Sequence, residues 1–163
     1  MTEKDTIKAA IASAPVPIEI SAREGATHWG RQELFAAGAL TVGELLANVP
    51  GATLMSAGFM LAPALVAWHG DPAGVRVFLD GVEREEMTLR NGGVTDFSLI
   101  PLWSLEDVTL EETVGELRVH LRTWHVERTT PATRTDVLTG SENLNLFRGY
   151  FGKRASNGAV IQM

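Results

Sequence analysis

Four histidines and several carboxylates are the residues of this chain that could do acid–base or metal chemistry. His120 and His125 are five residues apart, which places them on opposite faces of a regular strand, so surface histidines are favoured over metal ligands. His28 and His69 each adjoin a tryptophan in a glycine-containing segment, which favours loop anchors over acid–base groups. Because the chain has no cysteine, thiolate catalysis, thiolate metal sites and disulfides are excluded.

The carboxylates have no spacing typical of a catalytic pair or a cation site. Asp80 is explained by the turn it forms with Gly81. A solvated acidic surface accounts for the other candidates, which are Glu83, Glu85, Glu86, Glu111 and Glu112. No serine lies in a Gly-x-Ser-x-Gly elbow, and no glycine-rich phosphate loop is present. The sequence therefore predicts no catalytic residue, no metal site and no cofactor, and hence a protein that is not an enzyme.

Charge is distributed unevenly along the chain, whose net charge is −6. Residues 1–116 hold 7 Lys and Arg against 17 Asp and Glu, whereas residues 117–163 hold 7 against 3. Neither part has the dense basic patch that binds phosphates, so nucleic acid is not an expected partner. No apolar run reaches the ~20 residues of a membrane-spanning helix. Residues 1–8 lack the apolar core of a secretory signal, which predicts either prior removal of a signal or another route.

The clearest local signal is a helix start at Thr41. Thr41 and Glu44 fit a capping box, in which the hydroxyl accepts from the Glu44 amide while the glutamate reaches back. A helix is therefore expected over Val42–Asn48, with its leucines buried. Pro50-Gly51 ends it, because proline cannot continue a helix and glycine supplies a flexible exit.

The other patterns predict mainly short strands. A strand over Val75–Leu79 returns through an Asp80-Gly81 turn, because both central positions tolerate positive φ. From Leu117 apolar and polar residues alternate, and the phase slips near Thr123–Trp124, where a bulge or strand break is expected. Further expected elements are a helix over Trp29–Ala37, a capped turn at Asp96–Leu99, and strands over Ile18–Ile20, Ala52–Met55, Val108–Leu110, Thr133–Leu138, Asn143–Phe151 and Ala159–Met163.

These elements together predict an α+β fold, in which a small mixed sheet with short helices is followed by an antiparallel β meander. We expect a flexible leader at residues 1–16, where prolines favour extended backbone. A domain is expected at residues 17–116 and a β-strand tail at residues 117–163.

The most apolar stretch runs from Met55 to Trp68 and is interrupted by residues that resist regular structure. One interpretation is an exposed ligand or partner surface, because exposed apolar patches usually mark binding sites. The other is a buried loop packed on the sheet. The sequence leaves both open.

Four segments, in this order, resemble the plug domain of TonB-dependent outer-membrane receptors. They are the helix and its Val-Pro-Gly stop in Thr41–Thr53, the strand and turn in Val75–Val82, and then Leu99–Leu102 and Leu105–Glu112. In that family the last two are the approach to the final plug helix and the strand before the barrel. Asn143–Ala159 is similar to the early barrel strands of such receptors.

The resemblance implies a non-enzymatic protein that occludes a barrel, contacts a small ligand and is coupled to a TonB-type protein. The implied location is the outer membrane or periplasm of a Gram-negative-type bacterium. The candidate coupling segment is Ile18, Glu19 and Ile20. The candidate ligand or partner surface is Phe59, Met60, Leu61, Trp68, His69 and Arg90. The candidate strand-pairing tail is Leu117, Val119, Leu121, Trp124, Phe147, Tyr150 and Phe151.

Chain length limits what the tail can form. A plugged transporter has about 22 strands of roughly 9–11 residues, which need about 220 residues for the strands alone. We therefore expect no closed barrel from these 163 residues. The alternative is a truncated plug-fold protein reused as a soluble, non-catalytic binding or structural subunit of a larger periplasmic or membrane-associated assembly, whose partner completes the tail by strand addition.

Overall fold

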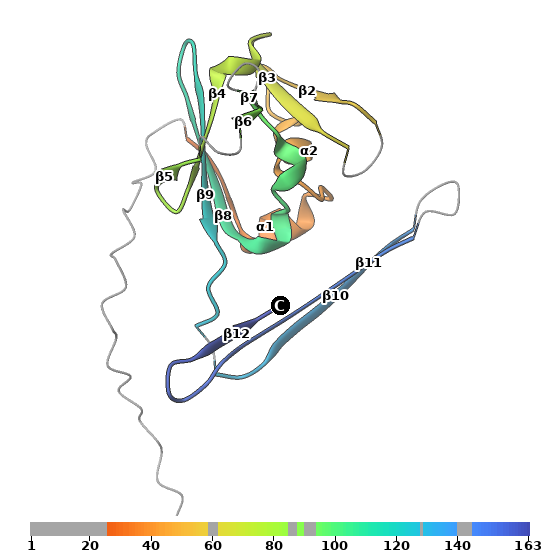
Figure 1. Cartoon of the computed structure of the whole chain (residues 1–163), viewed down its shortest axis with the longest axis vertical. Helices are drawn as coiled ribbons and strands as arrows, with labels where there is room; N and C mark the ends of the chain where they lie inside the picture. Colours follow the sequence, from red (N-terminus) through yellow and green to blue (C-terminus); the bar gives the residue numbers. More distant parts are fainter. Residues whose placement is uncertain (1–25, 59–61, 85–87, 90–93, 128, 140–144) are drawn as a thin grey trace, which may run out of the picture. The chain divides into compact units, whose positions relative to one another are not determined.

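The computed structural model describes residues 26–58, 62–84, 88–89, 94–127, 129–139 and 145–163 (Figure 1). These residues form two compact units that divide between Trp124 and His125. Strands dominate and the helices are short, which confirms the predicted α+β class with a following antiparallel meander. The leader expected at residues 1–16 lies outside the described residues.

The first unit is built on a five-stranded mixed sheet. The strand order is β1 (Thr27–Gly30), β8 (Leu105–Glu112), β9 (Leu117–Thr123), β4 (Val75–Leu79) and β5 (Val82–Glu83). β4 and β9 are parallel and the other neighbours are antiparallel. The strand predicted over Val75–Leu79 is confirmed, and β8 contains the one predicted at Val108–Leu110. β9 was expected to open the tail, but it lies between β8 and β4 in the middle of this sheet.

Side-chain alternation along the strands gives this sheet one apolar face. Figure 1 shows α2 (Val42–Leu46) and the hairpin of β2 (Ala52–Ser56) and β3 (Ala64–Trp68) on one side of the sheet. The residues that the two sides bury between them form a single core cluster. Its most buried members include Leu45, Leu46, Val66, Phe97, Val108, Leu110, Leu117 and Val119.

Thr41 begins α2 as predicted. Its Oγ1 accepts from the Glu44 amide at 3.3 Å, and the Glu44 carboxylate accepts from the Leu40 amide at 2.6 Å rather than from the Thr41 amide. The helix ends at Leu46 instead of Asn48. Gly51 then adopts a φ of 90°, which only glycine takes without strain, and directs the chain into β2.

β3 is a strand that the sequence did not reveal. Each residue of β3 pairs with β2, from Ala52 opposite Trp68 to Ser56 opposite Ala64. Four of its five residues are buried. Because both faces of such a strand are covered, it lacks the alternation that identifies a half-exposed strand. Ala64–Trp68 is therefore neither an exposed surface nor a loop.

The segment expected as one helix from Trp29 to Ala37 is divided in two. Trp29 and Gly30 end β1, where Trp29 pairs with Val108. α1 begins at Arg31 and ends at Ala36, with Leu34 buried and Phe35 partly buried. Pairing with a strand far along the chain overrides the local helical pattern at Trp29.

Turns and short helices connect these strands. The Asp80-Gly81 turn forms as predicted, with φ values of 50° and 83°. Asp96 also caps a helix as predicted, because its Oδ1 accepts from the Ser98 amide at 3.0 Å. The short elements are η1 (Pro72–Gly74), β6 (Thr88–Leu89), β7 (Val94–Thr95), η3 (Phe97–Leu99) and η4 (Leu102–Ser104).

The second unit is an antiparallel sheet of β10 (Ala132–Thr139), β11 (Asn145–Arg154) and β12 (Val160–Gln162). Residues directly opposite each other share a face, so the register assigns each side chain to one of two faces. All four hydrophobic residues of this unit that are more than half exposed lie on one face, and the arginines of β10 and β11 lie on the other. The first set is Val137, Phe147, Ile161 and Met163, and the second is Arg134, Arg148 and Arg154.

Candidate functional site

The outer face of the five-stranded sheet carries a set of charged residues. Strand register places Arg76 and Phe78 of β4 beside Arg118 and His120 of β9, and these beside Glu111 and Thr109 of β8. This face is the reverse of the one that lines the core. Side-chain contacts between the strands link most of these groups into one network.

Arg76 is the centre of this network. Its Nε donates to Glu83 Oε1 at 2.7 Å, a second bond joins Nη2 to the same carboxylate, and Nη1 donates to Glu116 Oε1 at 2.9 Å. Hydrogen bonding to Glu83, then to Glu116, raises the pKa of Arg76 above its ordinary value. The same bonds from Arg76 lower the pKa of Glu83 and of Glu116. Both carboxylates therefore stay ionised, and neither is suited to donate a proton near neutral pH.

The histidines of the outer face are structural. His120 stacks on Phe78 with ring centroids 4.9 Å apart, and its Nε2 lies 3.5 Å from Glu111 Oε2. His28 Nδ1 is 2.9 Å from Thr109 Oγ1. His125 lies after the end of β9 and belongs to the second unit. Within the described parts of the chain, no three His, Cys, Asp or Glu side chains are grouped so that they could hold a metal ion.

The ion pairs of this face are partly open to solvent. The side chains of Arg76 and Arg118 are 41% and 40% exposed to solvent. Solvent screens such pairs, so they add little to stability. What they provide is a hydrophilic sheet face whose charges are paired, which suits contact with water or with another polar protein surface.

The predicted ligand surface is only partly described. Trp68 is 4% exposed and belongs to the core cluster, so it is not a surface residue. Its Nε1 donates to the Thr113 carbonyl at 3.4 Å. His69 is exposed, sits in a turn at a φ of 48°, and lies with its ring 4.3 Å from that of Trp68. The remaining candidates lie outside the described residues, and they are Phe59, Met60, Leu61 and Arg90.

The predicted strand-pairing tail divides into two groups, and Trp124, which follows β9, is partly buried and lies beneath the Arg31 guanidinium. The first group, Leu117, Val119 and Leu121, is buried in β9, which already has neighbours on both edges. These residues therefore belong to the core and pair internally. In the second unit, Phe147 is 70% exposed, and Tyr150 and Phe151 are partly exposed. The candidate coupling segment, Ile18, Glu19 and Ile20, lies outside the described residues.

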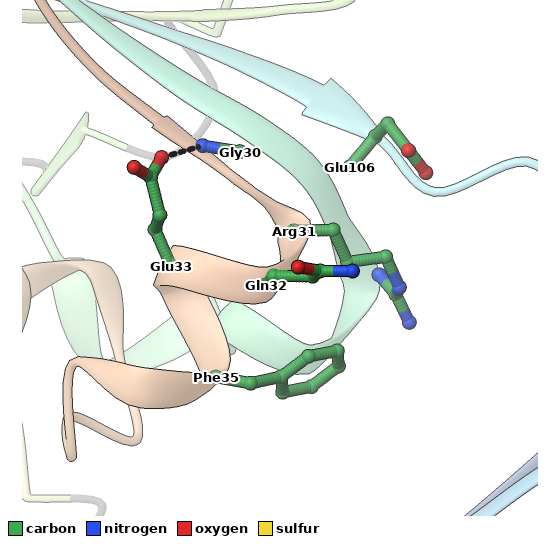
Figure 2. Close-up of a pocket in the computed structure, with 6 residues that line it drawn as sticks. All are labelled: Gly30, Arg31, Gln32, Glu33, Phe35 and Glu106. Carbon is green, nitrogen blue, oxygen red and sulfur yellow. Dashed lines mark hydrogen bonds between the residues drawn. The ribbon is translucent and has the colours of Figure 1, made fainter.

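Arg31 forms a cluster that the sequence patterns did not identify. It lines a shallow, open depression with Gly30, Gln32, Glu33, Phe35 and Glu106, which Figure 2 shows. Its guanidinium donates to the carbonyls of Leu105 and Trp103, which are 74 and 72 residues away in sequence. Only the spacing of four between Arg31 and Phe35 on α1 was a local signal for this contact.

The sequence of residues 21–114 matches the TonB-dependent receptor plug domain. Because this match covers more than half of the chain, the protein belongs to the TonB-dependent receptor plug family, and the resemblance drawn from its four segments is confirmed. No curated protein matches the chain in sequence. No helix in the described residues is long and apolar enough to cross a membrane.

Two solved structures are similar in fold. The ferric yersiniabactin uptake receptor FyuA from Yersinia pestis has 18% identity and a TM-score of 0.55, and the match covers 78% of this chain and 21% of the receptor. The copper transporter OprC has 15% identity and a TM-score of 0.54, and the match covers 79% of this chain and 21% of the transporter. The chain thus spans about a fifth of each of these proteins.

Proposed function

We propose that this chain acts as the plug of a TonB-dependent receptor in the outer membrane of a Gram-negative-type bacterium. In this role it occludes a barrel, contacts a small ligand and is moved by a TonB-type protein, without catalysis. The observation that carries the proposal is the family match over residues 21–114, which is followed along the chain by β9 and then by the strand meander of β10, β11 and β12.

The two faces of the meander support a place at the start of a barrel wall. Membrane barrel strands alternate between lipid-facing apolar residues and inward-facing polar residues. Val137 and Phe147 lie opposite each other on the apolar face, and Arg148 and Arg134 lie on the other. The pattern has exceptions, because Lys153 lies on the apolar face, and Leu146, Tyr150 and Val160 lie on the face of the arginines.

The polar outer face of the plug sheet supports occlusion of a water-lined barrel. Such a wall is polar, so a plug facing it needs paired charges rather than apolar surface. The Arg76 and Arg118 network supplies them. Ligand contact is assigned to the predicted surface that includes His69 and Arg90.

An association test addresses the coupling role. We expect deletion of residues 1–20 to abolish capture of the chain by the C-terminal domain of a TonB-type protein. Deletion of residues 1–14 alone keeps Ile18, Glu19 and Ile20, and should leave capture intact. Equal capture of both deletion variants by that domain would rule out the proposed coupling segment. Fractionation of cells tests the location, and recovery outside the outer membrane would argue against the plug role.

The alternative role is a soluble binding subunit completed by another protein. The observation in its favour is that, in the described residues, pairing on the β12 side of β11 runs from Phe151, which exchanges two backbone hydrogen bonds with Met163, to Arg154, while β11 begins at Asn145. A strand from a partner would continue this pairing along β11. Recovery of the chain in the periplasm, in a complex that resists detergent removal, would favour this role over the plug.

A further inference from the structure

Arg31 occupies the junction between β1 and α1. Gly30 ends β1 and Arg31 is the first residue of the helix. The Glu33 carboxylate accepts from the Gly30 amide at 2.8 Å, which fixes the backbone at this junction, as the dashed bond in Figure 2 shows. The chain that precedes Arg31 is therefore joined to α1 through a backbone that this hydrogen bond holds in place.

The guanidinium of Arg31 joins three parts of the first unit. Nη1 donates to the Leu105 carbonyl at 2.5 Å and Nη2 to the Trp103 carbonyl at 3.2 Å. The same group lies over the Trp124 ring at 3.9 Å and the Phe35 ring at 4.8 Å. Trp124 is itself held by its amide, which donates to the Ser104 carbonyl at 2.9 Å. One side chain thus ties α1 to the start of β8 and to the residue that follows β9.

β1, in contrast, is weakly attached. It is a strand of four residues at the edge of the sheet, and β8 is its one neighbour there among the described residues. Thr27 and His28 are exposed, and Trp29 is only partly buried against the core. Removing β1 leaves the pairing of β8, β9 and β4 intact, so it can open locally at less cost than global unfolding.

The direction of pairing decides how β1 responds to tension. β1 is antiparallel to β8, with Thr27 opposite Leu110 and Gly30 opposite Asp107. Tension on the chain before Thr27, resisted by β8 beyond Leu110, loads the residue pairs one after another. The strand therefore unzips from Thr27 towards Gly30, and the next contact in line is the Arg31 cluster.

We propose that Arg31 is a mechanical stop. Tension applied before β1 strips this strand from β8 and halts at Arg31, which keeps α1, α2 and the core in place. The stop rests on the proposed function, because it limits how far the pulled plug unravels. It defines a first opening of four residues, followed by a pause.

Force spectroscopy on the full chain tests this stop without a TonB-type protein. The chain has no cysteine, so Ala26→Cys and Val114→Cys introduce unique handle sites, and Val114 is fully exposed. We expect a first release that frees the four residues of β1, which is about 14 Å of chain at ~3.5 Å each, followed by a pause. Arg31→Met removes the charged group and keeps an apolar stem. Loss of hydrogen bonds to a charged donor should shorten the pause by about tenfold or more.

Arg76→Met is the matched control, because it removes another partly exposed arginine from ion pairs on β4. It should leave the pause unchanged. Arg31→Lys keeps the charge but not the planar fork that holds two carbonyls, and should restore the pause only in part. An unchanged pause in Arg31→Met overturns the stop. If that variant does not fold, a wild-type first release that includes α1 overturns it as well.

The outcomes of this test and of the association test are independent. If the pause depends on Arg31 but a TonB-type protein does not capture the chain, the stop is supported and the proposed coupling to a TonB-type protein is contradicted. Capture without such a pause supports the coupling role and removes the stop.

Discussion

Replacing Asp96 should destabilise the first unit strongly, because one carboxylate oxygen of this residue joins two parts of the core. Asp96 is 8% exposed. Its Oδ1 accepts from the Ala64 amide at 3.1 Å, the Ser98 amide at 3.0 Å and the Ser98 hydroxyl at 2.8 Å. The first bond reaches the start of β3 and the other two cap η3. Asp96→Ala therefore removes a helix cap and leaves the buried Ala64 amide without its acceptor.

The magnitude follows from these two losses. Removing a cap costs about 0.5–2 kcal/mol, and a buried amide left without a partner costs about 1–3 kcal/mol. We expect Asp96→Ala to lower the free energy of unfolding by about 2–4 kcal/mol at pH 7. Asp96→Asn keeps an acceptor oxygen and loses the charge, so about 1 kcal/mol is expected. Asp71→Ala is the matched control, because Asp71 caps η1 through the Ala73 amide at 2.9 Å but is exposed.

The pH dependence gives a second check. Burial alone raises the pKa of Asp96, but the hydrogen bonds from Ala64 and Ser98 outweigh it and leave this pKa below its ordinary value. The stability that comes from the carboxylate is therefore fully present above the unfolded pKa of about 3.9 and is lost as pH falls through the folded pKa. The advantage of the wild type over Asp96→Asn should stay constant above about pH 5 and shrink in acid.

The assay is urea unfolding followed by tryptophan fluorescence, between pH 7 and pH 3, for the wild type and the three variants. Asp71→Ala should cost clearly less than Asp96→Ala. The reasoning is refuted if these two variants lose equal stability, or if the gap between the wild type and Asp96→Asn widens as the pH is lowered.

Three further changes test separate parts of the fold. Gly43→Ala should destabilise the protein by about 1–3 kcal/mol in urea unfolding, because the added Cβ would lie 3.0 Å from Phe97 Cβ. Helix propensity alone predicts the opposite, a gain of about 1 kcal/mol. Equal or greater stability of the variant would therefore contradict the packing argument. Gly81→Ala should cost about 1–2 kcal/mol, since Gly81 has a φ of 83°, and an unchanged midpoint would show that the turn relaxes. If the apolar face of the meander contacts lipid, Phe147→Arg should lower stability by about 2–4 kcal/mol and reduce recovery of the protein in the membrane fraction. Leu146→Arg, on the opposite face, should do neither. Equal losses of stability and recovery in the two variants would count against that orientation.

Local chemistry was sufficient to predict the caps and turns. The Thr41 cap, the Asp80-Gly81 turn and the Asp96 cap each depend on residues within three positions in sequence. In each case the two residues that form the cap or the turn are both present in the same short segment. The family resemblance also came from such short segments, which is why the four segments were enough to indicate it.

Partners far apart in sequence were not predictable in this way. Alternation identified β9 as a strand, but nothing in the segment indicates that β4 is its parallel neighbour or that β8 lies on its other edge. β3 escaped notice because its burial on both faces removes the alternation. The contacts of Arg31 span more than seventy residues. Single-sequence patterns carry no information about such pairs.

The order of strands in the five-stranded sheet also bears on how the nascent chain is handled. Among the described residues β1 has β8 as its sheet neighbour, and β4, which pairs with β5 on one edge, gains the neighbour on its other edge only when β9 is made. At about 5–20 residues per second, synthesis of the eighty or so residues between His28 and Thr109 lasts on the order of ten seconds. For that time β1 lacks the sheet partner that satisfies its backbone groups in the folded unit. Synthesis therefore leaves a window in which this unpaired strand is open to aggregation.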